Sequence, residues 1–168
     1  RPEVEKLEAF FSEAALFRYR VRVEIEYLIF LAKAREIDFI PQLTPQAVGE
    51  LRGLYRAFRS EDAEAIAAWD RKVNHDVKAV EYWIREQIGK LGLSEWSEAV
   101  HFALTSEDVN NLAYALMVRE ARDLVLLPAL TELGGALQEL ALREASTPML
   151  ARTHGQPATP TTMGKELA

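Results

Sequence analysis

The sequence predicts an all-α protein, and two observations carry this prediction. Apolar residues recur at helical spacings of three and four along nearly the whole chain, while convincing strand alternation appears nowhere. Residues that favour helix starts, Ser12, Thr44 and Ser60, precede several of these stretches. At 168 residues, 49% of them hydrophobic, the chain is long enough for one domain and part of a second around a sizeable core.

The first long helix is expected from Ser12 to Ile37. Apolar side chains keep helical spacing from Leu16 through Val23 to Leu31. Residues 20–30, "RVRVEIEYLIF", alternate as a strand would, but the length of the surrounding pattern favours a helix.

Two further helices are expected after residue 43. Thr44 is predicted to cap the first, with Pro45 at its first position, where the missing N–H costs little. Ser60 opens the second, "SEDAEAIAAWDRKV", whose first turn carries acids that interact favourably with the helix dipole.

The next helix is predicted over residues 76–92, "DVKAVEYWIREQIGKLG", and should end at Gly89 or Gly92. A shorter helix is expected in "SEWSEAVHFAL", residues 94–104. Together these segments complete a helical region that reaches residue 104.

The longest helix is expected from Thr105 to about Ala145, with a bend at Pro128. Residues 124–142 leave only a narrow polar strip, so this helix needs neighbours on nearly every side. Because the chain looks too small to supply them, we expect a helical bundle completed by further residues, by other subunits, or by both.

Composition excludes several classes of protein. The absence of cysteine excludes disulfides and thiolate metal sites, and fits a cytoplasmic protein. A net charge of −6 argues against nucleic acid or an anionic membrane as partner, so an anionic ligand would need a locally positive pocket. No secretory signal is recognisable, and no apolar run is expected to reach the ~20 residues of a membrane span.

The chain has three histidines, and each lies among polar residues. His75 lies between Asn74 and Asp76 at a predicted helix start, His101 precedes "FALTSEDVNN", and His154 lies in "RTHGQPATP". Each has a structural explanation: Asn74 and Asp76 as N-terminal caps, His101 as a core residue with one hydrogen bond, and His154 as part of an ordered turn.

The segment "TSEDVNN" allows two interpretations. Thr105 with Asp108 forms a capping-box pattern at the start of the longest helix. The hydroxyls of Thr105 and Ser106, together with the free N–H groups of a helix start, also suit an anion.

The tract around His154 predicts a rigid loop, because Gly155, Pro157 and Pro160 restrict the backbone. A titratable side chain held on such a loop suits acid or base catalysis. No His-x₃-His or carboxylate pattern has the spacing of metal ligands, so no metal site is expected.

Three segments resemble one enzyme family. "RTHGQPATPTTMGKELA", residues 152–168, is similar to the second signature region of the fumarase and aspartase superfamily, and "HFALTSEDVNN" resembles its first. "NHDVKAVEYWI" resembles a segment of the branch that acts on succinylated purine nucleotides. The three occur in the family's order, and the resemblance covers residues 11–168.

The resemblance implies the architecture of the family. Residues 1–104 would form its N-terminal helical domain, and residues 105–168 the truncated first part of its central long-helix bundle. The chain would be the amino-terminal fragment of a longer, homotetrameric enzyme. It would be inactive alone, because the family's catalytic serine loop, Gly-Ser-Ser-x-Met-Pro, does not occur in the sequence.

The resemblance also implies a reaction: a β-elimination in purine biosynthesis that releases fumarate from a small-molecule nucleotide substrate, with no metal or organic cofactor. His154 would be the general acid. Seven further residues would bind the substrate: Asn74, His75, Asp76, Thr105, Ser106, Thr153 and His101. Of these, His101 would lie near the nucleotide phosphate.

Two alternatives remain open. One is a sister lyase of the argininosuccinate or carboxymuconate type, which shares the "TS" and "THGQPA" signatures. The other is a noncatalytic helical interaction module, because fold alone does not fix function.

Overall fold

The computed structural model describes residues 4–34, 37 and 40–168, and the chain divides into two compact units, Arg1–Ala121 and Arg122–Ala168. Helices dominate both units, which confirms the predicted fold class, and the strands form one small two-stranded sheet. The family-domain boundary expected after residue 104 stays a prediction.

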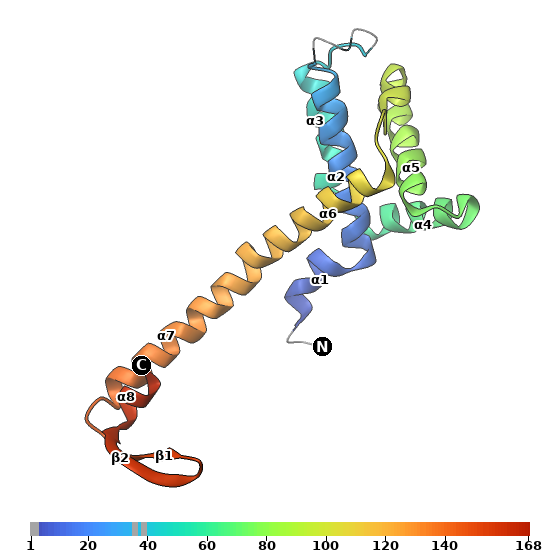
Figure 1. Cartoon of the computed structure of the whole chain (residues 1–168). Coiled ribbons are helices and arrows are strands. Elements are labelled where there is room, and N and C mark those ends of the chain that lie inside the picture. Colours follow the sequence, from blue (N-terminus) through green and yellow to red (C-terminus); the bar gives the residue numbers. More distant parts are fainter. Residues whose placement is uncertain (1–3, 35–36, 38–39) are drawn as a thin grey trace. The chain divides into compact units, whose positions relative to one another are not determined.

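All secondary-structure elements in the described part of the first unit are helices (Figure 1). Helix α2 contacts α3, α4, α5 and α6, so it is the central helix of the unit. The elements are α1 (Glu5–Phe11), α2 (Glu13–Leu31), α3 (Pro45–Arg56), α4 (Ser60–Val73), α5 (Asp76–Lys90), the 3₁₀ helix η2 (Ser94–Ala99) and α6 (Ser106–Ala121).

The core of this unit forms where α2 meets α5. Val21, Ile25 and Leu28 of α2 are buried together with Ile84 and Ile88 of α5. Helix α2 is buried on most of its sides, which explains how its strand-like alternation is compatible with a helix: Arg20 and Glu24, between the apolar residues, are buried too. Burial of so much apolar surface is the main stabilising contribution of this unit.

The predicted caps are confirmed at two helix starts. The Ser12 hydroxyl accepts a hydrogen bond from the Ala15 N–H, and Thr44 accepts one from Ala47, both at 3.1 Å. Ser60 does begin α4, but the cap position belongs to Arg59, whose N–H donates to the Asp62 carboxylate at 2.9 Å.

Three local predictions need correction. Helix α2 ends at Leu31 rather than Ile37: the Lys33 N–H bonds to the Phe30 carbonyl, and the Ala34 N–H is shared between Phe30 and Leu31, which tightens the last turn, while residues 35–36 of the predicted helix lie outside the described residues. The short helix α1 was not expected, and the Ser12 N–H ends it by bonding to Glu8. Residues 94–99 form a 3₁₀ helix rather than an α-helix.

The last helical residue of α5 is Lys90, and Gly92, one of the two glycines predicted to end the helix, follows its C-cap Leu91. Gly92 has φ +74°, its N–H bonds to the Gly89 carbonyl, and the Leu93 N–H bonds to the Ile88 carbonyl. This pair of bonds defines a Schellman motif, in which the left-handed residue is usually glycine.

The two glycines at this helix end should respond oppositely to alanine. Gly92→Ala should lower the free energy of unfolding by about 1 kcal/mol, because an L-residue is strained at positive φ. Gly89→Ala, inside the helix, should raise it by about 0.5–1 kcal/mol, since its added Cβ would approach nothing closer than Ser94 Oγ at 3.9 Å.

Urea unfolding followed by tryptophan fluorescence measures this difference, because all three tryptophans, Trp69, Trp83 and Trp96, lie in the first unit. Equal effects of the two substitutions would contradict the assigned helix end.

The second unit contains the π-helical turn η3 (Arg122–Leu126), α7 (Leu127–Arg143), β1 (Pro148–Thr153), β2 (Gln156–Thr162) and α8 (Met163–Leu167). Helical residues run without interruption from Ser106 to Arg143, which confirms the long helix. Pro128 lies in the first turn of α7, directly after the π turn, where hydrogen bonding is already altered. The bend expected at Pro128 stays a prediction.

The tract predicted as a rigid loop is an antiparallel hairpin. Pro148 pairs with Thr162, and Thr153 pairs with Gln156, leaving His154 and Gly155 as the turn. Both turn residues have positive φ, 49° and 75°, as a type I′ turn requires. The prolines of β2 are tolerated because each strand of a two-stranded sheet has a free edge.

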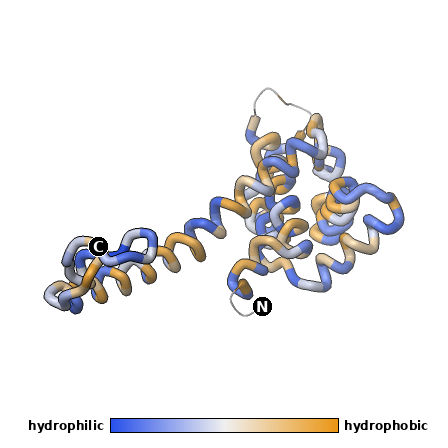
Figure 2. The backbone as a smooth tube through the Cα atoms, turned by 60° about the horizontal axis from the view of Figure 1, so that its bottom comes forward, coloured by the Kyte–Doolittle hydropathy of each residue, from blue (hydrophilic) through white to orange (hydrophobic). Residues whose placement is uncertain are grey.

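Helix α7 exposes much apolar surface, and Figure 2 shows hydrophobic residues along most of it. None of its residues is buried, and Leu133 is 56% exposed. An 18-residue window of the helix Ser106–Arg143 has a mean hydropathy of 1.3, so length and composition alone would allow a membrane span. The expectation that no run reaches such a length is thereby corrected, although a bundle-core helix has the same composition.

We predict that α7 drives self-association of the chain, because its apolar side chains lack cover. Sedimentation velocity should show concentration-dependent oligomers that disappear in Leu133→Glu/Leu137→Glu. Gln138→Glu, on the same helix, is the control and should leave them intact. A wild-type chain that stays monomeric at high concentration, or that floats with lipid vesicles instead of self-associating, would contradict the prediction.

Candidate active site

The N-termini of α5 and α6 meet at His75 and Ser106. His75 caps α5, because its Nδ1 accepts a hydrogen bond from the Lys78 N–H at 3.1 Å. A neutral imidazole that accepts at Nδ1 carries its proton on Nε2, which lies 3.4 Å from Ser106 Oγ. Asn74, expected as an N-terminal cap, instead ends α4 with φ 50°.

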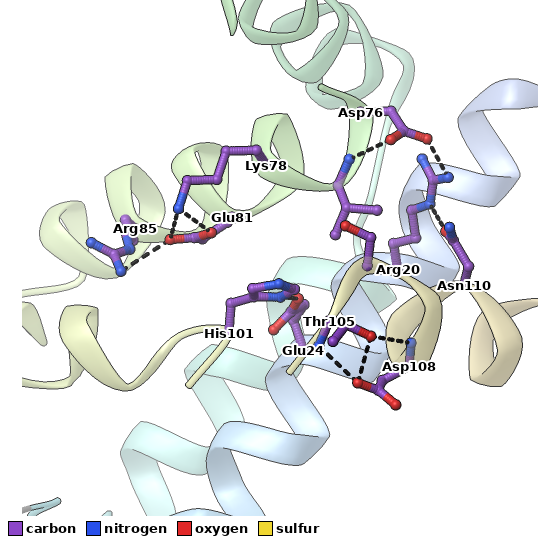
Figure 3. Close-up of polar contacts among 12 residues, drawn as sticks. Arg20, Glu24, Asp76, Lys78, Glu81, Arg85, His101, Thr105, Asp108 and Asn110 are labelled. Carbon is purple, nitrogen blue, oxygen red and sulfur yellow. Dashed lines mark hydrogen bonds and ion pairs between the residues drawn. The ribbon is translucent and has the colours of Figure 1, made fainter. Parts of the chain in front are cut away.

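A buried arginine joins these helix starts to α2. Arg20 is 3% exposed, its Nε donates to Asn110 Oδ1 at 2.9 Å, and a terminal nitrogen donates to Asp76 Oδ2 at 2.6 Å (Figure 3). One guanidinium therefore contacts the first residue of α5 and the second turn of α6. Its planar donors suit this double contact.

Asp76 is held as a carboxylate by its surroundings. Burial opposes its ionisation, but the charge and hydrogen bond of Arg20, with the Val77 N–H at 2.9 Å, outweigh burial and lower the pKa of the Asp76 carboxyl. An anion at a helix N-terminus is also favoured by the helix dipole.

The predicted capping box of α6 is confirmed. The Thr105 N–H and hydroxyl donate to Asp108 Oδ2 at 2.7 and 2.8 Å, and the Asp108 N–H bonds weakly to Thr105 Oγ1 at 3.4 Å. The backbone and hydroxyl hydrogen bonds of Thr105 lower the pKa of the Asp108 carboxyl. The Thr105 side chain is thus fixed before any ligand arrives.

His101 lies just ahead of this helix start, in contact with α2. Its Nδ1 is 2.5 Å from Glu24 Oε1, and its backbone has φ 62°. The hydrogen bond to Glu24 raises the pKa of the His101 imidazole although burial opposes this. His101 therefore makes one side-chain hydrogen bond, as its structural explanation predicted, and the partner is a buried carboxylate.

The first unit thus gathers most of the predicted site residues. Asn74, His75 and Asp76 lie next to Ser106 and Thr105 at two adjoining helix starts, with His101 beside Asp108. Thr153 and His154 belong to the second unit, where both are exposed at the hairpin turn. Their roles, like those of the other site residues, stay predictions.

Sequence reasoning missed three residues of this site: Arg20, Glu24 and Asn110. The one available signal was charged side chains inside the apolar run of α2, which predicts either paired buried charges or a solvated face. Without knowledge of the neighbouring helices, the sequence could not distinguish the two.

The chemistry of this region suits an anionic ligand. It offers a hydroxyl at Ser106 and an imidazole N–H at His75, both of which can donate to carboxylate or phosphate oxygens, beside two helix N-termini whose dipoles favour an anion. Within residues 4–34, 37 and 40–168, no cluster of three or more His, Asp and Glu side chains could hold a metal ion.

The chain matches the lyase family over residues 2–168, and it belongs to this family. Its fold is similar to those of two solved enzyme structures. A fumarate lyase from Mesorhizobium sp. BNC1 superposes with a TM-score of 0.74 at 22% identity, covering 97% of this chain and 36% of that one. The 3-carboxy-cis,cis-muconate lactonizing enzyme of Pseudomonas putida gives 0.71 at 25% identity, covering 96% and 35%.

Within the family, the chain is similar to adenylosuccinate lyases. The chain is 45% identical to the adenylosuccinate lyase of Escherichia coli K12 and 46% identical to that of Haemophilus influenzae. Each alignment covers 99% of this chain. The adenylosuccinate lyase of Dictyostelium discoideum is 46% identical over 98% of the chain. The chain spans 36–37% of the length of these relatives.

We expect the Arg20–Asp76 ion pair to stabilise the first unit. A double-mutant cycle of Arg20→Met and Asp76→Asn should give a coupling of about 1 kcal/mol at neutral pH, a modest value because half of the Asp76 side chain is exposed. Since the folded pKa of Asp76 is lowered, this contribution is present above the unfolded pKa of about 3.9 and is lost as the pH falls through the folded value.

Fluorescence-detected urea unfolding at several pH values measures the coupling. The Arg85–Glu98 pair, whose acid is 88% exposed, is the matched control and should couple by less than about 0.5 kcal/mol. A coupling at Arg20–Asp76 no larger than the control would show that the bridge does not stabilise the unit.

Proposed function

We propose that this chain is the amino-terminal part of an adenylosuccinate lyase. That enzyme would cleave adenylosuccinate to AMP and fumarate, and SAICAR to AICAR and fumarate. The observation that carries the proposal is 45% identity to the E. coli adenylosuccinate lyase across 99% of the chain. The carboxymuconate-type neighbour, at 25% identity, offers weaker support for the sister activity.

The proposed reaction is a β-elimination. A base removes a proton from the carbon next to a carboxylate of the succinyl group, the electron pair forms the C=C bond of fumarate, and the C–N bond breaks with its electron pair left on nitrogen. Negative charge develops on the carboxylate, so donors must already be in place there. The nitrogen leaves poorly as an anion, so it must receive a proton as the bond breaks.

The site residues suit these demands. His154, an exposed imidazole on a rigid hairpin turn, would be the general acid that protonates the nitrogen, with Thr153 beside it. Asn74, His75 and Asp76 would line the substrate site. Thr105 and Ser106 would bind substrate oxygens, and Ser106 Oγ lies 3.4 Å from His75 Nε2.

Other parts of the active enzyme would come from elsewhere. The base would be a serine beyond these 168 residues, and the exposed apolar face of α7 would be covered in a homotetrameric helical bundle. No cofactor or metal is required by this chemistry, and the protein would act in cytoplasmic purine biosynthesis.

The test uses a polypeptide of the relatives' full length that contains these residues. His154→Ala should reduce turnover of adenylosuccinate at least about a hundredfold, since general-acid catalysis typically contributes ~10²–10⁴. Ser146→Ala, at an exposed position just before the same hairpin, should leave turnover unchanged. The chain of 168 residues alone should release no fumarate.

Fumarate formation is followed by its ultraviolet absorbance, and circular dichroism checks folding of each variant. Wild-type turnover in His154→Ala would remove His154 from the role of acid. Absence of adenylosuccinate cleavage by the folded full-length protein, with cleavage of a carboxymuconate or argininosuccinate substrate instead, would overturn the proposed substrate.

A further inference from the structure

Glu24 is a buried carboxylate in the middle of α2. Its side chain is fully shielded from solvent. An unpaired charge in the protein interior is costly. Oε1 contacts His101 Nδ1 at 2.5 Å, and Oε2 has no hydrogen-bond partner within the part of the chain that the structure describes. His101 is thus the one hydrogen-bonding partner of Glu24 among those residues.

The other charges around this pair do not replace His101. Glu81 of α5 is also buried, but Lys78 and Arg85 of the same helix pair with it at 2.8 and 3.0 Å. On α6, Asp108 is engaged by Thr105. Glu24 therefore relies on the imidazole for a positive partner.

The backbone is shaped to bring His101 to Glu24. His101 and Ala103 both have positive φ, 62° and 57°, in the segment between η2 and α6. A residue with a side chain is strained in this region by about 1 kcal/mol or more, so the surrounding contacts must hold it there. Such strain is typical of functional sites, and here it orients one histidine.

The hydrogen bond leaves one ring nitrogen available. With Nδ1 bonded to Glu24, the Nε2–H of an imidazolium is the donor that remains, and the His101 side chain is 18% exposed. A doubly protonated ring beside a buried carboxylate is a fixed cation in a chain with a net charge of −6.

We propose that Glu24 is a positioning residue whose buried carboxylate holds the His101 imidazole through Nδ1, so that the Nε2–H is left to donate to an anionic group of the bound ligand. This inference rests on the proposed function for the identity of the ligand. It assigns to Glu24, a core residue of α2, a specific effect on ligand binding: it sets both the charge and the orientation of the imidazole.

The raised pKa of His101 agrees with this arrangement, because the hydrogen bond and charge of Glu24, with the charge of Glu81, favour the imidazolium over the opposing effects of burial and Lys78. The pH range in which His101 stays protonated should therefore extend above that of an ordinary histidine, about 6.5.

The test is an NMR titration of the imidazole resonances in the 168-residue chain. His101 should titrate above an ordinary histidine and carry protons on both nitrogens below its pKa. In Glu24→Gln its pKa should fall by about 1 unit or more, because the charged acceptor is lost. Glu81→Gln is the matched control, a second buried carboxylate, and should shift His101 less.

Inorganic phosphate is the probe for the anion. In the wild type it should shift the His101 resonances, and in Glu24→Gln the affinity should be at least about fivefold weaker, whereas His154 should respond equally in both. Fumarate at the same ionic strength distinguishes phosphate from carboxylate recognition and should perturb His101 less.

Several results would overturn the inference. One is a pKa of His101 in the wild-type chain at or below that of an ordinary histidine. This measurement does not depend on the folding of any variant. Another is a His101 pKa that is unchanged in a folded Glu24→Gln chain, and a third is phosphate binding that ignores His101 or Glu24. None of these measurements involves catalysis, so their failure leaves the proposed lyase reaction to be judged by the His154 experiment alone.

Discussion

The arrangement of the candidate site depends on a single buried guanidinium. Arg20 projects from the central helix and contacts Asp76 at the start of α5 and Asn110 in α6. A buried arginine is tolerated only when its donors are satisfied by geometry that neighbouring helices must preserve. The same contacts that neutralise Arg20 therefore fix where two helix N-termini, and the polar side chains on them, lie relative to each other.

Around this constraint, the polar groups of the site are fixed mainly by local backbone features. His75 is oriented by capping α5, Thr105 by its capping box, and His101 by a positive φ angle. Side chains whose rotamers and hydrogen bonds are already set lose little further freedom when a ligand binds. The unit combines an apolar core, which supplies stability, with helix starts at which polar groups are pre-positioned.

Much of this organisation could be predicted from the sequence, and the failures have physical causes. Helical periodicity and caps identified α2 to α7 because these signals are local, and Gly92 and the Thr105 box follow directly from sequence patterns. The hairpin was missed because its Thr- and Pro-rich strands lack alternation, although a His-Gly pair tolerates the positive φ of a type I′ turn. Arg20 and Glu24 were missed because their partners lie far away in sequence, and buried pairing is a tertiary property.

The central claim, that Arg20 holds the two helix starts together, is tested most directly by amide hydrogen exchange in Arg20→Met. The Val77 and Lys78 amides, which bond to Asp76 and His75, should exchange faster together with those of the first turn of α6, while the core amides of Ile84 and Ile88 keep their protection. Unchanged protection of Val77 and Lys78 in a folded variant would contradict the account.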